Sequence, residues 1–263
     1  GKGGAGTNND NEGVRIFNGA DITSTGTTAD AASITIIGTG GGTATSSNDG
    51  VTISDAGTTL SSARGNVSVT GTGGTSSGRG VELMNGAQIN VGTSSVLTVT
   101  GTGTGNAEAV AVLSPITSGT GTVTIRSEDG SSTTDDITFG ADGDITSITG
   151  TITIDADTPT NTTADVFMAN GALINAGSGL IDIDAEVDVT LGGLQTTGQV
   201  QVDAIAGAII DGGNTHSDIT AATAQLLAET GIGDAGDANG QLDTTANGAS
   251  LEIGASTVSG DIN

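Results

Sequence analysis

Apolar and polar residues alternate along this chain in short runs, and the runs return at a nearly regular spacing. The segments Gly13–Ile22 and Gly80–Ile89 match each other, with Asn-Gly-Ala at their centre. Residues 166–174 fit the same template, residues 137–145 fit it with Asp-Gly replacing Asn-Gly, and residues 51–60 fit it with one residue inserted. Self-similarity at such a period is typical of a repeat protein.

A further strand pattern follows each copy of the template and is formed by two aliphatic residues with one residue between them. Successive copies begin 33, 30, 26, 29, 29 and 19 residues apart. Gly-Thr-Gly follows several of them, as at 38–40, 71–73 and 101–103. The copies are Ile34–Ile36, Val67–Val69, Leu97–Val99, Val123–Ile125, Ile152–Ile154, Ile181–Ile183 and Val200–Val202.

These patterns predict an all-β fold, a right-handed parallel β-helix of eight or nine coils of irregular length. Alternating aliphatic and Thr/Ser residues indicate strands with one buried face, and Asn-Gly supplies a corner with positive φ. Each unit is too thin to bury its own apolar face, so units must stack to bury it. At ~4.8 Å per coil the rod would be about 40 Å long. The expected hand follows from the usual hand of parallel crossovers.

Other readings of the pattern are weaker. An antiparallel sandwich of immunoglobulin type would favour buried Trp, Tyr or Cys, and the chain has none of these. Disorder fits the charge and the low complexity, but it does not produce ordered alternation of Val and Ile. A helix over residues 221–229 would fit the Ala and Leu content, yet Thr-Gly-Ile-Gly at 230–233 favours a strand there.

The predicted organisation is a Gly/Asn-rich linker or incomplete coil over residues 1–12 and a single solenoid over residues 13–263. Repeats vary from about residue 190 onward. Neither end shows an amphipathic capping helix, and the sequence stops within an alternating pattern. Because repeat proteins normally cap their open ends, we expect a segment of a longer chain, or copies that stack end to end.

Three phrases in the variant region carry a resemblance to a known class of proteins. They are Gly-Ala-Ile-Ile-Asp-Gly-Gly-Asn at 207–214, Asp-Ile-Thr-Ala-Ala-Thr at 218–223 and Glu-Thr-Gly-Ile-Gly at 229–233. Residues 190–255 thereby resemble repeats of the filamentous-haemagglutinin-like and autotransporter-like adhesins, which are large bacterial surface proteins. The resemblance implies a right-handed parallel β-helix exported to the cell surface, where it acts in adhesion or as a structural fibre.

Composition excludes several classes of function. The chain has no Cys, Trp or Tyr, a single His, and 5 Lys+Arg against 30 Asp+Glu. It therefore cannot form thiolate or multi-histidine metal sites, and it cannot neutralise many phosphates, so nucleic-acid binding is not expected. Without a run of ~18 apolar residues, membrane insertion is not expected either.

The acidic residues are unevenly distributed, because residues 127–263 hold 22 acidic and no basic residues. If Ile125, Ile154 and Ile183 stack, Asp155 and Asp184 fall in one column with Arg126. Like charges one coil apart repel unless a cation lies between them. A second column of acidic residues has no arginine to neutralise it, and Ca²⁺ is the candidate cation that would bind there. Its members are Glu128, Asp157 and Glu186.

Two loops could also offer oxygen ligands to Ca²⁺, one at Asn9–Glu12 and one at Asp234, Asp237 and Asn239. Neither has the EF-hand spacing. The plain alternative for all the acidic residues is a solvated surface that keeps a Thr/Gly-rich rod soluble.

Catalytic arrangements are weakly supported. Asp155/Asp157 and Asp182/Asp184 are carboxylate pairs of the kind that glycan hydrolases use, but basic residues end at Arg126 and aromatic subsites are missing. We therefore expect no enzyme, no catalytic residue and no bound cofactor except a candidate Ca²⁺.

The sequence as a whole predicts an extracellular structural or adhesive solenoid segment at a bacterial cell surface. Its expected partners are further copies of itself, neighbouring repeats of a parent chain, or a ligand on a host surface or matrix. The alternative functions are a calcium-dependent surface-layer lattice and, after it, a glycan-active β-helix enzyme.

Overall fold

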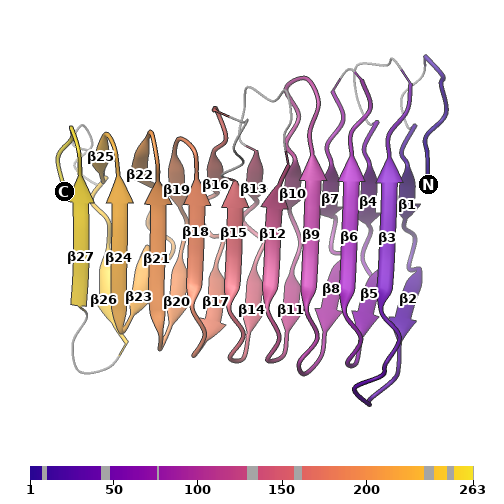
Figure 1. Ribbon diagram of the computed structural model, residues 1–263, viewed down its shortest axis with the longest axis horizontal. Coiled ribbons are helices and arrows are strands. Elements are labelled where there is room, and N and C mark those ends of the chain that lie inside the picture. The colour runs from indigo at the N-terminus through magenta and orange to yellow at the C-terminus, as the bar shows by residue number, and fades with distance from the viewer. Residues whose placement is uncertain are drawn as a thin grey trace.

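The protein is a rod of stacked strands, seen from the side in Figure 1. The computed structural model describes residues 1–7, 11–42, 48–75, 77–128, 136–156, 162–233, 240–247 and 252–262. Over these residues the regular structure consists of strands β1 to β27, and none of it is helical.

Each turn of the chain gives one strand to each of three parallel nine-stranded sheets. The first sheet comprises β1 (Val14–Ile16), β4 (Val51–Ser54), β7 (Val81–Met84), β10 (Val110–Val112), β13 (Ile137–Phe139), β16 (Val166–Met168), β19 (Val189–Leu191), β22 (Ala208–Asp211) and β25 (Gly231–Ile232). The second sheet comprises β2 (Asp21–Ser24), β5 (Thr59–Ser62), β8 (Gln88–Val91), β11 (Ile116–Ser118), β14 (Ile145–Ser147), β17 (Ile174–Gly177), β20 (Leu194–Thr196), β23 (Ile219–Ala221) and β26 (Thr244–Ala246). The third sheet comprises β3 (Ile34–Thr39), β6 (Val67–Thr72), β9 (Leu97–Thr102), β12 (Val123–Ser127), β15 (Ile152–Ala156), β18 (Ile181–Ala185), β21 (Gln199–Ala204), β24 (Thr223–Ala228) and β27 (Glu252–Thr257).

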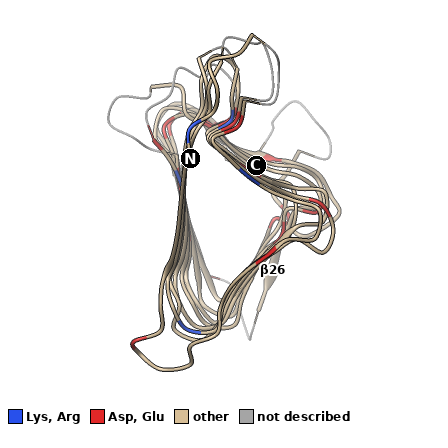
Figure 2. Ribbon diagram, turned by 90° about the vertical axis from the view of Figure 1, so that its right-hand side faces the viewer, with Lys and Arg blue, Asp and Glu red and all other residues tan. Residues whose placement is uncertain are grey.

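The parallel β-solenoid expected from the sequence is confirmed, with nine coils. Figure 2 looks along the rod and shows three walls around a common interior. Buried aliphatic side chains from all three sheets fill this interior. Each strand pairs in parallel with its equivalent one coil away, and Ile125 lies opposite Ile154, which lies opposite Ile183. All seven of the predicted aliphatic pairs belong to the third sheet. Residues 223–228 form strand β24, so the strand interpretation of that region is correct.

The core is one narrow column of aliphatic side chains that runs the length of the rod. Inward positions of β12, β15 and β18 alternate with outward Thr, Arg and Asp, as the period of two in a strand requires. Ile152, Ile154, Ile181 and Ile183 are fully buried. Burying each such side chain contributes about 1.5–3 kcal/mol, so stability accumulates coil by coil.

The Asn-Gly corners between the first and second sheets adopt positive φ, as the sequence predicts. Asn18 and Gly19 have φ of 59° and 77°, and Asn85 and Gly86 have φ of 56° and 80°. The Asp142–Gly143 corner turns differently, because neither residue has positive φ. There the N–H of Gly143 donates to the carbonyl of Gly140 at 2.8 Å.

The Gly-Thr-Gly repeats mark the places where the chain leaves the third sheet and passes close to its own next coil. A Cβ at Gly71 would overlap the carbonyl oxygen of Gly80, and a Cβ at Gly101 would overlap that of Ala109. Only glycine permits so close a backbone approach. The sequence pattern therefore records a steric requirement of the corner between the third and first sheets.

Candidate functional site

The outer face of the third sheet carries the acidic column that the sequence predicts. Arg126 lies opposite Asp155, which lies opposite Asp184, and the register continues to Asp203. The Nε of Arg126 is 3.5 Å from Oδ2 of Asp155 and 3.7 Å from Oε1 of Glu128. Arg126 thus neutralises the first carboxylate of the column, as expected.

The same face has a different chemical character in its two halves. On β6 and β9 the outward residues are hydroxyl-bearing, namely Ser68, Thr70 and Thr72, and Thr98, Thr100 and Thr102. On β18 and β21 the outward residues are instead Asp182 and Asp184, and Gln199, Gln201 and Asp203. Burial, and then the charge of Asp155, raise the pKa of Asp182. Part of the uneven charge of the sequence therefore lies on one continuous sheet face.

The second predicted column cannot be traced completely. Glu128 is exposed and Glu186 is half-buried, whereas Asp157 lies outside the described residues. Asn9 and Asp10 of the first candidate loop, and Asp234, Asp237 and Asn239 of the second, also lie outside them. Where the structure is described, no group of three or more His, Asp or Glu side chains is placed to hold a metal ion. Calcium binding stays a prediction.

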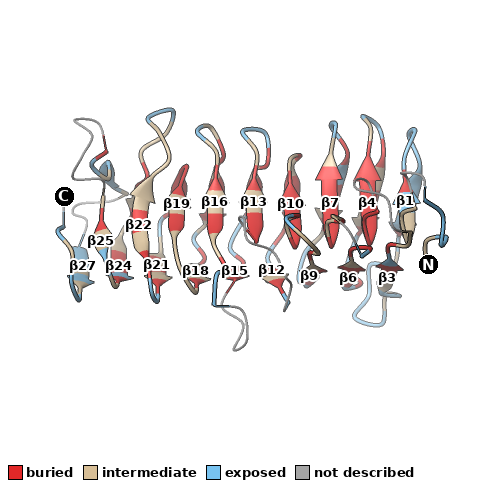
Figure 3. Ribbon diagram, turned by 90° about the horizontal axis from the view of Figure 1, so that it is seen from above, coloured by how far each residue is buried: buried red, intermediate tan, exposed pale blue. Residues whose placement is uncertain are grey.

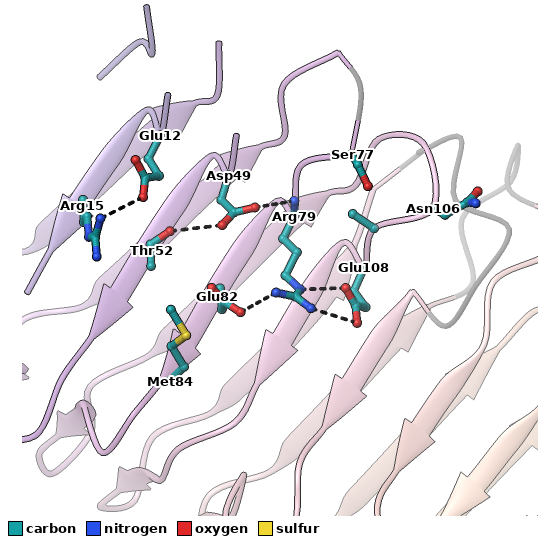
Figure 4. Close-up of a pocket in the computed structure, with 11 residues that line it drawn as sticks. Glu12, Arg15, Asp49, Thr52, Ser77, Arg79, Glu82, Met84, Asn106 and Glu108 are labelled. Carbon is teal, nitrogen blue, oxygen red and sulfur yellow. Dashed lines mark hydrogen bonds and ion pairs between the residues drawn. The ribbon is translucent and has the colours of Figure 1, made fainter. Parts of the chain in front are cut away.

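Sequence reasoning missed an ion cluster on the outer face of the first sheet, shown in Figure 4. Nη1 of Arg79 lies 2.5 Å from Oε1 of Glu82, and its Nε lies 2.7 Å from Oε2 of Glu108. The backbone N–H of Arg79 donates to Oδ1 of Asp49 at 2.7 Å. These residues come from three successive coils, so the cluster joins β4, β7 and β10 across the sheet.

The ion cluster lines a cavity of about 460 Å³ whose character is mostly acidic. Figure 3 shows that the strands around it, β4, β7 and β10, are buried along most of their length. Burial raises the pKa of Glu82 and of Asp49, although Arg79 acts in the opposite direction on both. The charged side chains in the wall of this cavity are Glu12, Arg15, Asp49, Arg79, Glu82 and Glu108.

Two signals in the sequence could have revealed this cluster. Arg79 and Glu82 are three residues apart, and Glu108 follows Arg79 by 29 residues, which is one coil. These contacts join three coils. The guanidinium of Arg79 binds Glu82 of its own coil and Glu108 of the next coil, and the backbone N–H of Arg79 binds Asp49 of the preceding coil.

A second group of acidic residues caps the coil corners, which sequence reasoning also missed. Asp165 accepts a hydrogen bond from the N–H of Asp188 at 2.8 Å, and Asp188 accepts one from Ala208 at 2.7 Å. Asp144 and Asp218 accept equivalent bonds from Leu173 and Asp243. Four acidic residues of the C-terminal half therefore satisfy backbone donors of the following coil.

Comparison of the chain with protein-family models, with curated proteins and with solved structures gives no match. The resemblance to bacterial adhesin repeats is thus supported at the level of the parallel β-helix and not at the level of a family. The described residues contain no helix that is long and apolar enough to cross a membrane.

Proposed function

We propose that this chain is a non-enzymatic, extracellular segment of a large bacterial surface protein of the filamentous-haemagglutinin-like or autotransporter-like type. In this proposal it acts as a stiff structural or adhesive rod. The support is mechanical: backbone pairing continues without interruption from coil to coil in three walls. Such a rod resists bending on every side and leaves its outer faces and loops free to meet a surface.

The two ends of the rod favour continuation of the stack, either by a second copy or by neighbouring repeats of a parent chain. Ile253 occupies an inward position, opposite the buried Ala224, yet it is 47% exposed. At the other end Val14 and Ile34 are half-buried, whereas their neighbours Val51 and Val67 are buried. Another coil placed on either end would complete the core.

Electron microscopy of the purified chain tests the stacking. We expect linear files of rods for the natural sequence, and their loss in Ile253→Lys, which places a charge on the open core. Thr146→Lys adds the same charge on an exposed side-face position of β14 and should leave the files intact. A chain that stays strictly monomeric at high concentration contradicts end-to-end assembly.

A calcium-dependent surface-layer lattice is the second candidate function, and the in-register column Asp155–Asp184–Asp203 is the observation that favours it. Carboxylate oxygens stacked one coil apart would gain from a shared divalent cation. Millimolar Ca²⁺ should then raise the melting temperature, and a chelator should dissolve any lattice. An unchanged melting temperature contradicts this candidate and leaves the rod proposal standing.

A further inference from the structure

Asp218 is a buried carboxylate at the corner that leads into β23. Only 1% of its surface is exposed. Its Oδ2 accepts a hydrogen bond from the backbone N–H of Asp243 at 2.6 Å. Its Oδ1 is buried, and no hydrogen-bond donor of the described residues reaches it. A charged carboxylate with one oxygen unsatisfied in this way is costly to bury.

The charged groups around Asp218 make its negative form still less favourable. Asp211, at the end of β22, and Asp243, immediately before β26, both act on it as like charges. His216 lies two residues before it, but its Nε2 lies 3.2 Å from the carbonyl oxygen of Gly171. The adjacent strand β20 has the sequence Leu-Gln-Thr and offers no compensating charge.

Among the described residues, no group of three or more acidic or His side chains is placed to hold a metal ion that would offset this charge. A proton does offset it, since a neutral carboxyl group is far cheaper to bury than an anion. We propose that Asp218 is a proton-operated latch: when protonated it lets the coil that carries β26 pack on β23, and when ionised it favours opening of that coil.

The position of the latch explains why its effect would be local. Asp218 joins its own coil to the next through Asp243, and β26 pairs only with β23 among the described strands. The residues of β26 are all exposed. A strand with so few buried contacts has a low free energy of local opening. A change in the protonation of one buried carboxyl group can therefore decide whether this strand is paired or open.

The direction of the pH effect follows from the titration of the group. Burial, followed by the charges of Asp211 and Asp243, raises the pKa of Asp218 from 3.8 to about 7. An open coil exposes the carboxyl to water and returns its pKa toward the ordinary value. The closed state is therefore favoured fully below pH 4 and loses that advantage as pH rises to 7. The opening equilibrium should increase by up to about a thousandfold over this window.

Asp144 provides a matched control within the same chain. It occupies the same place three coils earlier, and its Oδ1 accepts the N–H of Leu173 at 2.9 Å. Unlike Asp218, it is half-buried. Asp144→Asn and Asp218→Asn both preserve an acceptor for the next coil, and each removes one carboxyl group.

Hydrogen exchange on the full chain between pH 4 and 8, corrected for intrinsic exchange rates, tests the latch at the amides of Asp243 and Asn247. We expect opening to rise steeply up to pH 7 in the natural protein and in Asp144→Asn, and to be nearly flat in Asp218→Asn. Flat opening in the natural protein, or an undiminished pH dependence in Asp218→Asn, overturns the proposal.

If Asp218→Asn fails to fold, the carboxyl carbon of Asp218 can be titrated by NMR in the natural chain. A midpoint near 7 supports the latch, and a midpoint near 4 overturns it. Because neither measurement depends on filaments or on a bacterial surface, its outcome is independent of the proposed function.

Discussion

The guanidinium of Arg79 lies 2.5 Å from the carboxylate of Glu82, whose side chain is only 5% exposed. The same guanidinium also contacts Glu108 of the next coil. A single basic side chain therefore compensates two carboxylates in the wall of one cavity. Arg79 is thus a single residue that links three coils of the solenoid.

Replacing Arg79 by Met should destabilise the protein by about 3 kcal/mol, since it leaves Glu82 buried without its cation. Denaturant unfolding followed by circular dichroism measures the loss. The double variant Arg79→Met, Glu82→Met should recover part of it, because the more deeply buried of the two uncompensated carboxylates is then gone while Glu108 remains. Arg15→Met is the control, as its 3.4 Å pair with Glu12 involves an arginine that is 41% exposed, and it should cost less than ~1 kcal/mol. Equal losses in the two single variants would contradict the assignment.

Truncating one of the stacked isoleucines should show how much core packing contributes to the free energy of unfolding. Ile154 is fully buried between Ile125 and Ile183, so Ile154→Ala should cost roughly 2–5 kcal/mol. The adjacent Thr153 points outward, and Thr153→Ala should change stability by no more than ~0.5 kcal/mol. Similar unfolding midpoints for both variants would show that the interior is not packed as described.

Glycine at the corner between the third and first sheets should not tolerate a side chain. In Gly71→Ala the new Cβ would overlap the carbonyl of Gly80, and relieving that overlap should cost about 1–3 kcal/mol. Gly254→Ala meets no atom within 4 Å and should be neutral or slightly stabilising because it restricts the unfolded chain. Thermal melts of the two variants compare them directly. A neutral Gly71→Ala would refute the steric explanation of Gly-Thr-Gly.

Charge repulsion along the third sheet should be measurable through salt dependence. Asp184 lies between Asp155 and Asp203 at strand spacing, and Asp184→Asn should stabilise the protein by roughly 0.2–1 kcal/mol at low ionic strength. Added NaCl should reduce the gain, because salt screens exposed charges. Asp30→Asn makes the same charge change at an exposed turn residue and should have little effect. An identical response in both variants would mean that only net charge matters.

Several features of the site could be predicted from the sequence and several could not. The column of Arg126, Asp155 and Asp184 follows directly from aligning Ile125, Ile154 and Ile183. Successive side chains of a strand point to opposite faces, so the residues that come directly after the stacked, inward isoleucines must stack on the outer face. The coil spacing would place Arg79 beside Glu108, but it does not predict that Glu82 is buried. A pattern of residues does not reveal what covers the outer face of a sheet. The corner caps Asp165, Asp188 and Asp218 depend on which backbone N–H groups lack strand partners, which only the path of the chain decides.

The sequence by itself determined the fold class, the coil spacing and the strand register, since each follows from a local alternation repeated about every 29 residues. Backbone geometry converts that alternation into one buried face, and repetition converts one face into a continuous core. Only the tertiary structure decided which charged residues are buried and with what partners. The burial of Glu82, of Asp49 and of Asp218 depends on chain from neighbouring coils that covers each residue, and that information is not local to any of them.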